Sequence, residues 1–597
     1  MAFFARITPK IIAATTAINK YLDKRDIAAR ASIDENATQK PLLKSQMLGM
    51  VFLAGFTVLS LRVSYITIFR KVDIARSSAK AETERLRPRA DITDRNGVLL
   101  ATSLTSYSLY ADPAKIWDPR ETAQAIRTVF PALNEADLIA KLSSTKRFVW
   151  IKRRLTPRER QSVWALGQPG LEFETEARRT YPLGSSAGHI LGGINNEGEG
   201  ISGLERGLQG LLSNNEGDAI RLSIDSRVQF VLERELSEAA VKYRAANGVA
   251  AIMDIRTGEL LGAASWPFMN PNEYNANTPY SRENRFVNSV YEMGSTFKAF
   301  TFAAALSDGK ITPDSQFNAT KALKIGDFTI NDFHGQNRVM SAREILEHSS
   351  NIGTALIART LDGTRLADFY GEIGLLKRVS AEFSGAASPI VPKKWGKATQ
   401  VTASYGHGIA VSPLAVLAAY SAIGNGGVYL RPTMLARAEG AQVTGARVIS
   451  QQASSQIVGL LRNVVTSGTG RAADSEYYPV AGKTGTADKA SKGGYDENRR
   501  VSSFAGVFPS HNPQYAVFFL LDEPKGIGGG AATAGIVVAP SVSNIVGRVA
   551  PMMGVAPLRP IIAQEDAKNV ALNTVNTPQF PPKTIANRMP NNALAGR

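Results

Sequence analysis

The sequence predicts an α+β protein, in which a β-sheet packs against a large helical region. Two strand-rich segments, 248–265 and 502–524, lie far apart in the chain, and a long stretch of helical, loop and glycine-rich sequence separates them. A single apolar run near the N-terminus, at 47–69, has the length of a membrane-spanning helix. With 597 residues the chain is too long for one hydrophobic core, so we expect about two to four folded units.

The composition is that of a folded protein, with 44% hydrophobic and 20% charged residues. The chain contains no cysteine, which excludes disulfides, thiolate metal ligands and a cysteine nucleophile. The formal net charge of +17 favours an anionic partner such as an acidic polymer or a membrane surface, although solubility alone explains it equally well. No segment combines dense basic runs with interleaved aromatic residues, so nucleic acid is not expected as a partner.

The apolar run at 47–69 is expected to be a transmembrane helix. Its single charge, Arg62, costs about 3 kcal/mol at most and less when it snorkels or meets a partner helix. A buried core helix is the alternative, and a cleaved signal peptide is disfavoured because 46 residues precede the run. Eight Lys and Arg residues lie in 1–46 and seven in 70–89, so the charge rule does not orient the span.

The segments after the apolar run predict a stalk, a strand hairpin, a helical stretch and a linker. Residues 70–90 are polar and helix-favouring, which is typical of a stalk. The segment 91–113 is β-rich around an Asn-Gly turn, which predicts the hairpin. A helical pattern covers 120–175, and the turn-rich segment 178–212 predicts an ordered, loop-dominated linker.

A second unit is expected to begin at 222–243, where a strand runs into a long helix. Two strands about an Arg-Thr-Gly-Glu turn follow at 248–265, and two more β-rich runs lie at 502–524. The last segment, 561–597, has the composition of a disordered tail.

Serine followed three residues later by lysine occurs four times, and sequence context favours one pair. Ser295 follows a glycine and opens the helical segment STFKAFTFAAAL, so it lies where free N–H groups favour developing negative charge. Lys298 lies on the same helix face, and partial desolvation beside Phe297 and Phe300 favours loss of its proton. Taken alone, such a pair is more often an ordinary solvated pair than a catalytic one. The other pairs lie in stalk or turn sequence: Ser77/Lys80, Ser143/Lys146 and Ser307/Lys310.

Two further motifs strengthen this interpretation. The segment HSSNIGTALIA places Ser349, Ser350 and Asn351 at a helix start, where helix capping is the alternative role for the serines. The segment VAGKTGTADKA places Lys-Thr-Gly-Thr at 483–486, beside an expected strand. A phosphate loop is excluded there, because Tyr477 occupies the position that needs glycine. The order S-x-x-K, S-x-N and K-T-G is typical of penicillin-binding proteins and serine β-lactamases.

The chain resembles the class B penicillin-binding proteins over roughly residues 45–550. The segments 89–101, 179–205 and 405–432 are similar to that family's R-G-x-I-x-D-R-N-G, R-x-Y-P and G-x-G-I blocks. The chain departs from the family pattern at three positions, which are Ala90 for glycine, Ser412 for threonine and Met293 for proline. None of these departures removes a residue of the three motifs.

The resemblance implies a penicillin-binding/serine β-lactamase-like transpeptidase domain on an elongated, β-rich pedestal, with one N-terminal transmembrane helix. The expected division is a cytoplasmic segment, a transmembrane helix, a dimerisation-like pedestal, a transpeptidase domain and a disordered tail: 1–46, 47–69, 70–221, 222–560 and 561–597. It also implies a bacterial inner-membrane protein whose catalytic domain faces the periplasm. Glu205 and Arg178 are expected to belong to the pedestal fold.

The resemblance implies acyl transfer on peptide stems that end in D-Ala-D-Ala. Ser295 would be the nucleophile and Lys298 its base, and backbone N–H groups of Ser295 and Thr486 would hold the oxyanion. Ser349 would relay the proton to the leaving amine. Asn351 would bind a peptide carbonyl.

The remaining expected site residues lie at 483–486, and most of them would bind the terminal carboxylate of the substrate. Lys483 would keep the site positive, and Thr484 and Thr486 would offer hydroxyls to that carboxylate. Gly485 would let the substrate backbone lie against the strand without a Cβ in the way. No metal or organic cofactor is needed for this chemistry. Structural roles are expected for His334 and His407, and lining of the cleft is the alternative.

Within the family, the chain is most similar to the enzyme of septal peptidoglycan synthesis. The resemblance implies a glycosyltransferase of the FtsW type and other division proteins as partners. Arg62 would suit contact with such a partner in the membrane. The elongation-specific transpeptidase is the alternative, because it shares the chemistry. A β-lactam sensor or a β-lactamase is a further alternative that uses the same serine, and the sequence identifies no glutamate base for deacylation by water.

Overall fold

The computed structural model describes residues 50, 53–60, 89–214, 218–326, 328–491, 494–529 and 532–558. The chain divides into two compact units, 1–84 and 85–597. In the first unit, residues 53–60 form an exposed helix, in which the Thr57 hydroxyl donates to the Leu53 carbonyl at 2.7 Å. The rest of the predicted transmembrane helix, the N-terminal segment and the predicted disordered tail lie outside the described residues.

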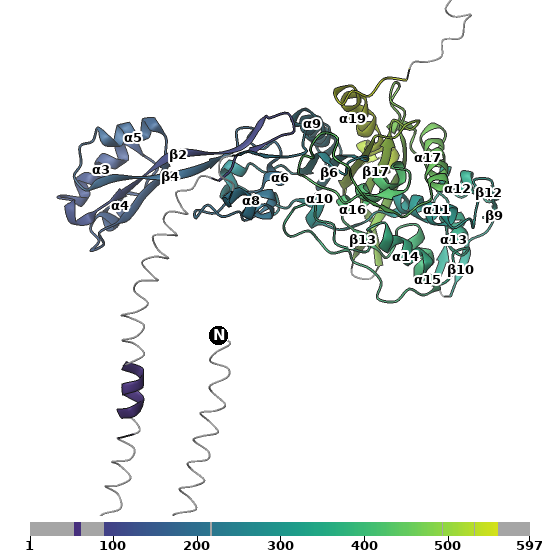
Figure 1. Ribbon diagram of the computed structural model, residues 1–597, viewed down its shortest axis with the longest axis horizontal. Coiled ribbons are helices and arrows are strands. Elements are labelled where there is room, and N and C mark those ends of the chain that lie inside the picture. The colour runs from purple at the N-terminus through teal and green to yellow at the C-terminus, as the bar shows by residue number, and fades with distance from the viewer. Residues whose placement is uncertain are drawn as a thin grey trace, which may run out of the picture. The chain divides into compact units, whose positions relative to one another are not determined.

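A five-stranded antiparallel sheet lies at the centre of the C-terminal part of the second unit (Figure 1). Its order is β16-β17-β18-β6-β7, with these bounds: β16 Ala481–Ser491, β17 Gly494–Phe508, β18 Tyr515–Asp522, β6 Asn247–Asp254 and β7 Leu260–Trp266. Every residue of β18 is buried, which explains why its sequence, YAVFFLLD, is apolar almost throughout. The segments 248–265 and 502–524 therefore pair in one sheet, and the predicted α+β class is confirmed.

Helices cover both faces of this sheet. Alternate residues of β6 and β18 pack into two separate apolar clusters. One cluster contains α9 (Ser226–Lys242) and α19 (Ala539–Met552), and the other contains α11 (Lys298–Ser307) and α16 (Pro413–Gly424). Nearly all of α16 is buried, as expected for a helix that is apolar on every side.

One helical stretch among the described residues, Ala534–Met552, has the length and apolar character of a membrane span. It comprises α18 (Ala534–Val537) and α19. Half of its most apolar 18-residue stretch is buried within the protein. Its residues Val542, Ile545 and Val549 belong to the apolar cluster that α9 and α19 form with one face of the sheet. We therefore assign it as a core helix.

The remaining elements of the C-terminal part are short and surround the sheet. Four two-stranded sheets form by the pairs β8–β13, β9–β12, β10–β11 and β14–β15. The helices are η2 Pro271–Ala276, α10 Arg285–Asn288, η3 Gly294–Phe297, α12 Ala342–Glu347, α13 Asn351–Ala358, α14 Arg365–Glu372, α15 Lys397–Ser404, α17 Gln451–Thr466, η4 Arg471–Ala473 and η5 Ile527–Gly529. The strands are β8 Tyr291–Glu292, β9 Gln316–Asn318, β10 Leu323–Ile325, β11 Phe328–Ile330, β12 Val339–Ser341, β13 Ala410–Val411, β14 Val428–Tyr429 and β15 Ala446–Arg447.

The N-terminal part of the second unit contains a second sheet, of order β3-β2-β1-β5, with β4 also paired to β2. The strands are β1 Ile92–Thr93, β2 Leu99–Ala111, β3 Val149–Leu155, β4 Leu171–Thr180 and β5 Ile220–Arg221. The helices are η1 Pro113–Lys115, α3 Pro119–Val129, α4 Glu135–Leu142, α5 Pro157–Trp164, α6 Gly188–Leu191, α7 Gly203–Gly207 and α8 Gln209–Asn214.

The hairpin predicted around the Asn-Gly turn is confirmed, because β1 and β2 pair antiparallel across it. Gly97 at this turn has φ of +87°, a conformation that favours glycine. The helical prediction for 120–175 is wrong in part, since β3 and the start of β4 lie inside that range. The strand β3, VWIKRRL, mixes apolar and basic residues in a way that fits a helix face as well as a strand.

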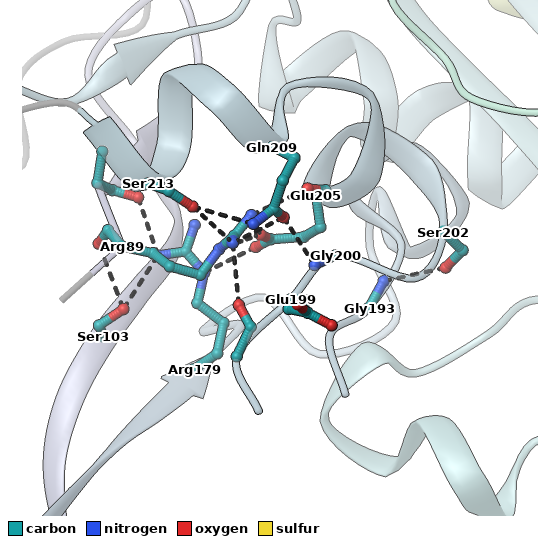
Figure 2. Close-up of polar contacts among 12 residues, drawn as sticks. Arg89, Ser103, Arg179, Gly193, Glu199, Gly200, Ser202, Glu205, Gln209 and Ser213 are labelled. Atoms are coloured by element: carbon teal, nitrogen blue, oxygen red, sulfur yellow. Dashed lines mark hydrogen bonds and ion pairs between the residues drawn. The ribbon is translucent and has the colours of Figure 1, made fainter. Parts of the chain in front are cut away.

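Glu205 of α7 lies fully buried between two arginines, Arg89 and Arg179 (Figure 2). Its carboxylate accepts from Nε of Arg89 at 2.9 Å and from Nε of Arg179 at 2.7 Å. Arg179 is buried in this network, whereas the adjacent Arg178 is only partly buried, because alternate residues of β4 face opposite sides of the sheet. A buried carboxylate is tolerated only when charged or hydrogen-bonded partners compensate its lost hydration.

Replacing Glu205 with glutamine removes the charge that pairs both buried guanidinium groups. We expect a loss of about 3–5 kcal/mol in unfolding free energy, because an uncompensated buried charge remains. Chemical denaturation of the purified protein measures this loss. Glu199→Gln is the matched control, since Glu199 is an exposed residue of the preceding loop. Equal stability of the two variants would contradict the assigned role of Glu205.

Candidate active site

Ser295 lies at the start of the helical segment that continues as α11. It belongs to the short 3-10 helix η3 and is partly exposed, whereas the residues around it are buried. The preceding Gly294 has φ of +54°, and a Cβ there would lie 2.9 Å from the carbonyl oxygen of Thr486. Glycine at 294 therefore lets the helix start approach strand β16 closely.

Lys298 is the first residue of α11, and its side chain is fully buried. Its Nζ lies 3.0 Å from Oγ of Ser295, so the S-x-x-K pair is in contact. The same nitrogen lies 2.5 Å from the carbonyl oxygen and 3.1 Å from the hydroxyl of Ser349, and 2.7 Å from Oδ1 of Asn351. The structure therefore brings the S-x-x-K and S-x-N motifs together around one amine.

The environment of Lys298 favours its neutral form. Burial lowers the pKa of Lys298 well below its ordinary value, and the positive charge of Lys483 lowers it further, while Asp332 opposes this shift. A neutral amine at hydrogen-bond distance from the serine hydroxyl can accept the hydroxyl proton. The geometry thus places a serine hydroxyl beside an amine that is able to act as its base.

Ser349 and Ser350 have different roles in the turn between α12 and α13. Ser350, not Ser349, caps α13, because its hydroxyl accepts from the amide of Gly353 at 2.9 Å. Ser349 has φ of +59°, an uncommon conformation for a residue with a side chain. This turn directs both the carbonyl oxygen and the hydroxyl of Ser349 to Lys298.

Asp332 holds this turn from a neighbouring loop. Its carboxylate accepts from the Ser350 hydroxyl at 2.7 Å and from the Ile352 amide at 2.9 Å. The preceding carbonyl, of Asn331, accepts from the side chain of Asn351 at 3.1 Å. Sequence reasoning missed Asp332, because its loop carries no motif that distinguishes it from other polar loops.

The Lys-Thr-Gly-Thr motif lies on strand β16. Lys483 is fully buried and donates to the Thr484 carbonyl at 3.0 Å, and burial lowers its pKa to about 7. The Thr484 hydroxyl lies 2.7 Å from that of Thr469, a residue that the sequence did not single out. The Thr486 hydroxyl accepts from the amide of Ala534 at 3.1 Å. Both threonine hydroxyls are therefore already held by the protein.

The structure gives a different reason for glycine at 485 from the one expected. A Cβ at Gly485 would collide with the carbonyl oxygen of Met293, so the chain itself requires glycine here. A Cβ at Gly406 would likewise collide with the carbonyl oxygen of Gly294. Met293, the position that departs from the family pattern, is fully buried, and its carbonyl accepts from the Thr296 hydroxyl at 3.0 Å.

His407 lies beside this cluster, between two tyrosine rings. Its ring centroid is 5.1 Å from that of Tyr405 and 5.6 Å from that of Tyr495. Burial, together with the charge of Lys298, lowers the pKa of His407. His334 packs edge-on against Phe333. Within the described ranges, His, Asp and Glu side chains do not gather into a group of three that could hold a metal ion.

Comparison with known proteins identifies the family. Residues 248–546 match the model of the penicillin-binding protein transpeptidase domain, and residues 85–218 match that of the penicillin-binding protein dimerisation domain. The chain belongs to the class B penicillin-binding proteins. The sequence-based assignment to this family is thereby confirmed.

Individual relatives agree with this family. The chain is 40% identical over 481 residues to the probable peptidoglycan D,D-transpeptidase FtsI of Caulobacter vibrioides. This match covers 78% of this chain and 82% of the relative. It is 30% identical over 502 residues to the peptidoglycan D,D-transpeptidase FtsI of Escherichia coli, covering 79% and 84%. The crystal structure of penicillin-binding protein 3 from Mycobacterium tuberculosis with aztreonam has the same fold, with a TM-score of 0.63, 24% identity, and coverage of 80% of this chain and 99% of that one.

Replacing Asp332 with asparagine tests how the turn supports the amine. Asp332 raises the pKa of Lys298, so its loss lowers that pKa further and moves the acid limb of the acylation rate to lower pH. Loss of the charged acceptor also loosens the turn, and we expect the maximal rate to fall about tenfold. Stopped-flow acylation by a fluorescent penicillin between pH 5 and 10 measures both effects. The control is Asp314→Asn, an exposed residue, and an unmoved acid limb in Asp332→Asn would refute the coupling.

Proposed function

We propose that this chain is a serine-type peptidoglycan D,D-transpeptidase, which cross-links peptide stems through an acyl-enzyme and is a target of β-lactams. The observation that carries the proposal is the buried amine of Lys298, at hydrogen-bond distance from Ser295, Ser349 and Asn351 at once. The names of the relatives, peptidoglycan D,D-transpeptidases, support the substrate class.

In the proposed reaction, Oγ of Ser295 attacks the carbonyl carbon of the penultimate D-Ala while Nζ of Lys298 accepts the hydroxyl proton. The C–N bond to the terminal D-Ala then breaks, and Ser349 relays the proton to the leaving amine. This leaves an ester between Ser295 and the donor stem. The amine of a neighbouring stem attacks the ester, which forms the cross-link and returns the proton to the serine.

The remaining site residues are proposed to bind the substrate. Backbone N–H groups of Ser295 and Thr486 would hold the oxyanion, and Asn351 would bind a peptide carbonyl. Lys483 and the hydroxyls of Thr484 and Thr486 would receive the terminal carboxylate. Each hydroxyl bonded within the protein still has lone pairs or a proton for a ligand.

A fluorescent penicillin tests the proposed nucleophile. Ser295→Ala should abolish covalent labelling, because the alanine has no oxygen to acylate. Ser143→Ala is the matched control, since this exposed serine belongs to another S-x-x-K pair and should label as the wild type does. Retained labelling of Ser295→Ala, seen after denaturing electrophoresis, would show that another residue is acylated.

We propose a septal role, because the two relatives described above are both named FtsI. The elongation-specific transpeptidase is the alternative. A sensor or β-lactamase is disfavoured, because no carboxylate is a hydrogen-bonding partner of Ser295 or Lys298 among the described residues.

Depletion of the protein should give filamentous cells, since septation stops while elongation continues. Round cells on depletion would favour the elongation role.

The family also supports a proposal for topology and partners. The segment 47–69 would span the inner membrane once, with 1–46 in the cytoplasm, 70–221 as the pedestal, 222–560 as the periplasmic transpeptidase domain and 561–597 as a disordered tail. An FtsW-type glycosyltransferase and other division proteins would be the partners.

Arg62 is proposed to contact the glycosyltransferase within the membrane. Arg62→Leu should therefore weaken co-purification of the two proteins, and unchanged co-purification would contradict this role of Arg62.

A further inference from the structure

One face of helix α5, in the N-terminal part of the second unit, lines a surface cavity that the proposed reaction does not use. The cavity measures about 390 Å³, and its lining contains Pro157, Arg160, Gln161 and Trp164. These residues occupy positions i, i+3, i+4 and i+7 of α5, so they lie along one side of the helix. None of them belongs to the Lys298 cluster.

The helix that presents this face is fixed at its start and against the sheet. Thr156 and Glu159 form a reciprocal capping box, and Pro157 occupies the first helical position. Val163 is buried in the apolar cluster between α5 and the strands. The face is therefore part of a rigid element, which is the usual support for a binding site.

Trp164 is an exposed aromatic platform on this face. Its side chain is 72% exposed, although tryptophan is one of the most costly side chains to leave in water. The ring stacks on Phe173 of β4, with centroids 6.2 Å apart and an interplanar angle of 27°. This contact supports the indole against the sheet while most of its surface remains available to a ligand.

Arg160 is held beside Trp164 by aromatic rings rather than by a carboxylate. Its guanidinium carbon lies 3.8 Å from the ring centre of Tyr107 and 5.7 Å from that of Phe173. The nearby cations Lys152 and Arg153, by contrast, are paired with Glu159 and Glu176. In the part of the chain that the structure describes, no protein acceptor binds the Arg160 guanidinium and none binds the Gln161 amide.

We propose that this cavity binds an amino-sugar glycan that carries carboxylates, of the kind found in peptidoglycan strands. A pyranose ring presents a face of C–H groups to the Trp164 indole, a carboxylate accepts a bidentate pair from Arg160, and an acetamido group exchanges hydrogen bonds with Gln161. The identity of the polymer rests on the proposed function, whereas the sugar-and-carboxylate chemistry rests on the residues of the cavity.

The chemistry of the lining favours a saccharide over a protein partner. The cavity is open to solvent and measures about 390 Å³, so it can receive a small polar group such as a sugar ring without enclosing it. A stable protein interface needs about 800 Å² from each partner and an apolar centre. Here a single exposed aromatic ring is flanked by two polar side chains with free donors, which suits a polar ligand with one apolar face.

Binding of a soluble peptidoglycan disaccharide-peptide to the full-length, detergent-solubilised protein tests this proposal. The protein is first acylated with unlabelled penicillin, so that the serine site is blocked and any binding measured lies elsewhere. Saturation-transfer NMR should show contacts from protein aromatic protons to the sugar ring, and titration calorimetry gives the dissociation constant. We expect Trp164→Ala to weaken binding at least tenfold and Trp117→Ala, which removes another highly exposed tryptophan, to leave it unchanged.

A second variant separates the role of charge from that of stacking. Arg160→Gln should remove the preference for the carboxylate-bearing disaccharide over the neutral N,N′-diacetylchitobiose, while leaving the sugar-ring contacts in place. No binding by the wild type, or equal binding by Trp164→Ala and Trp117→Ala, would overturn the proposal. A protein that co-purifies with the wild type but not with Trp164→Ala, without saccharide binding, would also overturn it in favour of a protein partner.

Failure here is distinguishable from failure of the proposed function. If fluorescent penicillin labels the protein at Ser295 but the disaccharide-peptide does not bind, only the α5 site is wrong. If penicillin does not label the protein, the transpeptidase assignment fails, and saccharide binding is then measured on the unacylated chain. Trp164→Ala should label with penicillin as the wild type does, which shows that its serine site is intact, and its far-UV circular dichroism should match that of the wild type.

Discussion

The burial of the Lys298 amine is the constraint on which the site depends. An ammonium group removed from water needs acceptors from the protein or gives up its proton. Here the acceptors are oxygens of Ser295, Ser349 and Asn351, which come from two segments far apart in the sequence. The start of α11 and the turn before α13 must therefore meet around this amine.

Close backbone approach makes this meeting possible. Gly294, Gly406 and Gly485 lie where three segments converge, and a Cβ at any of them would press on the backbone of a neighbouring segment. The motif residues are thus of two kinds: some offer polar atoms, and others offer only the absence of a side chain. Gly485 belongs to the second kind, because Met293 of this chain, rather than a substrate, occupies the space beside it.

The pattern of separated strand-rich and helical segments was enough to predict the α+β class, and the order and spacing of three motifs predicted residues that surround Lys298. The supporting residues were not predictable in the same way. Asp332 and Thr469 act through contacts with Ser350 and Thr484, and an isolated aspartate or threonine in a loop carries no signal of such a contact. Arg179 was not singled out either, because recognising the buried one of two adjacent arginines requires knowing which face of the strand each one occupies.

The chain compensates buried charge in two ways, and the difference separates stability from reactivity. Glu205 is paired directly with two guanidinium groups, those of Arg89 and Arg179, and this network serves the fold. The hydrogen-bonding partners of Lys298 are neutral oxygens, and among the neighbouring charges the one that shifts its pKa most is another cation, Lys483. Its proton is therefore the weakly held one, and the site that lacks an opposite charge in contact is the site able to transfer a proton.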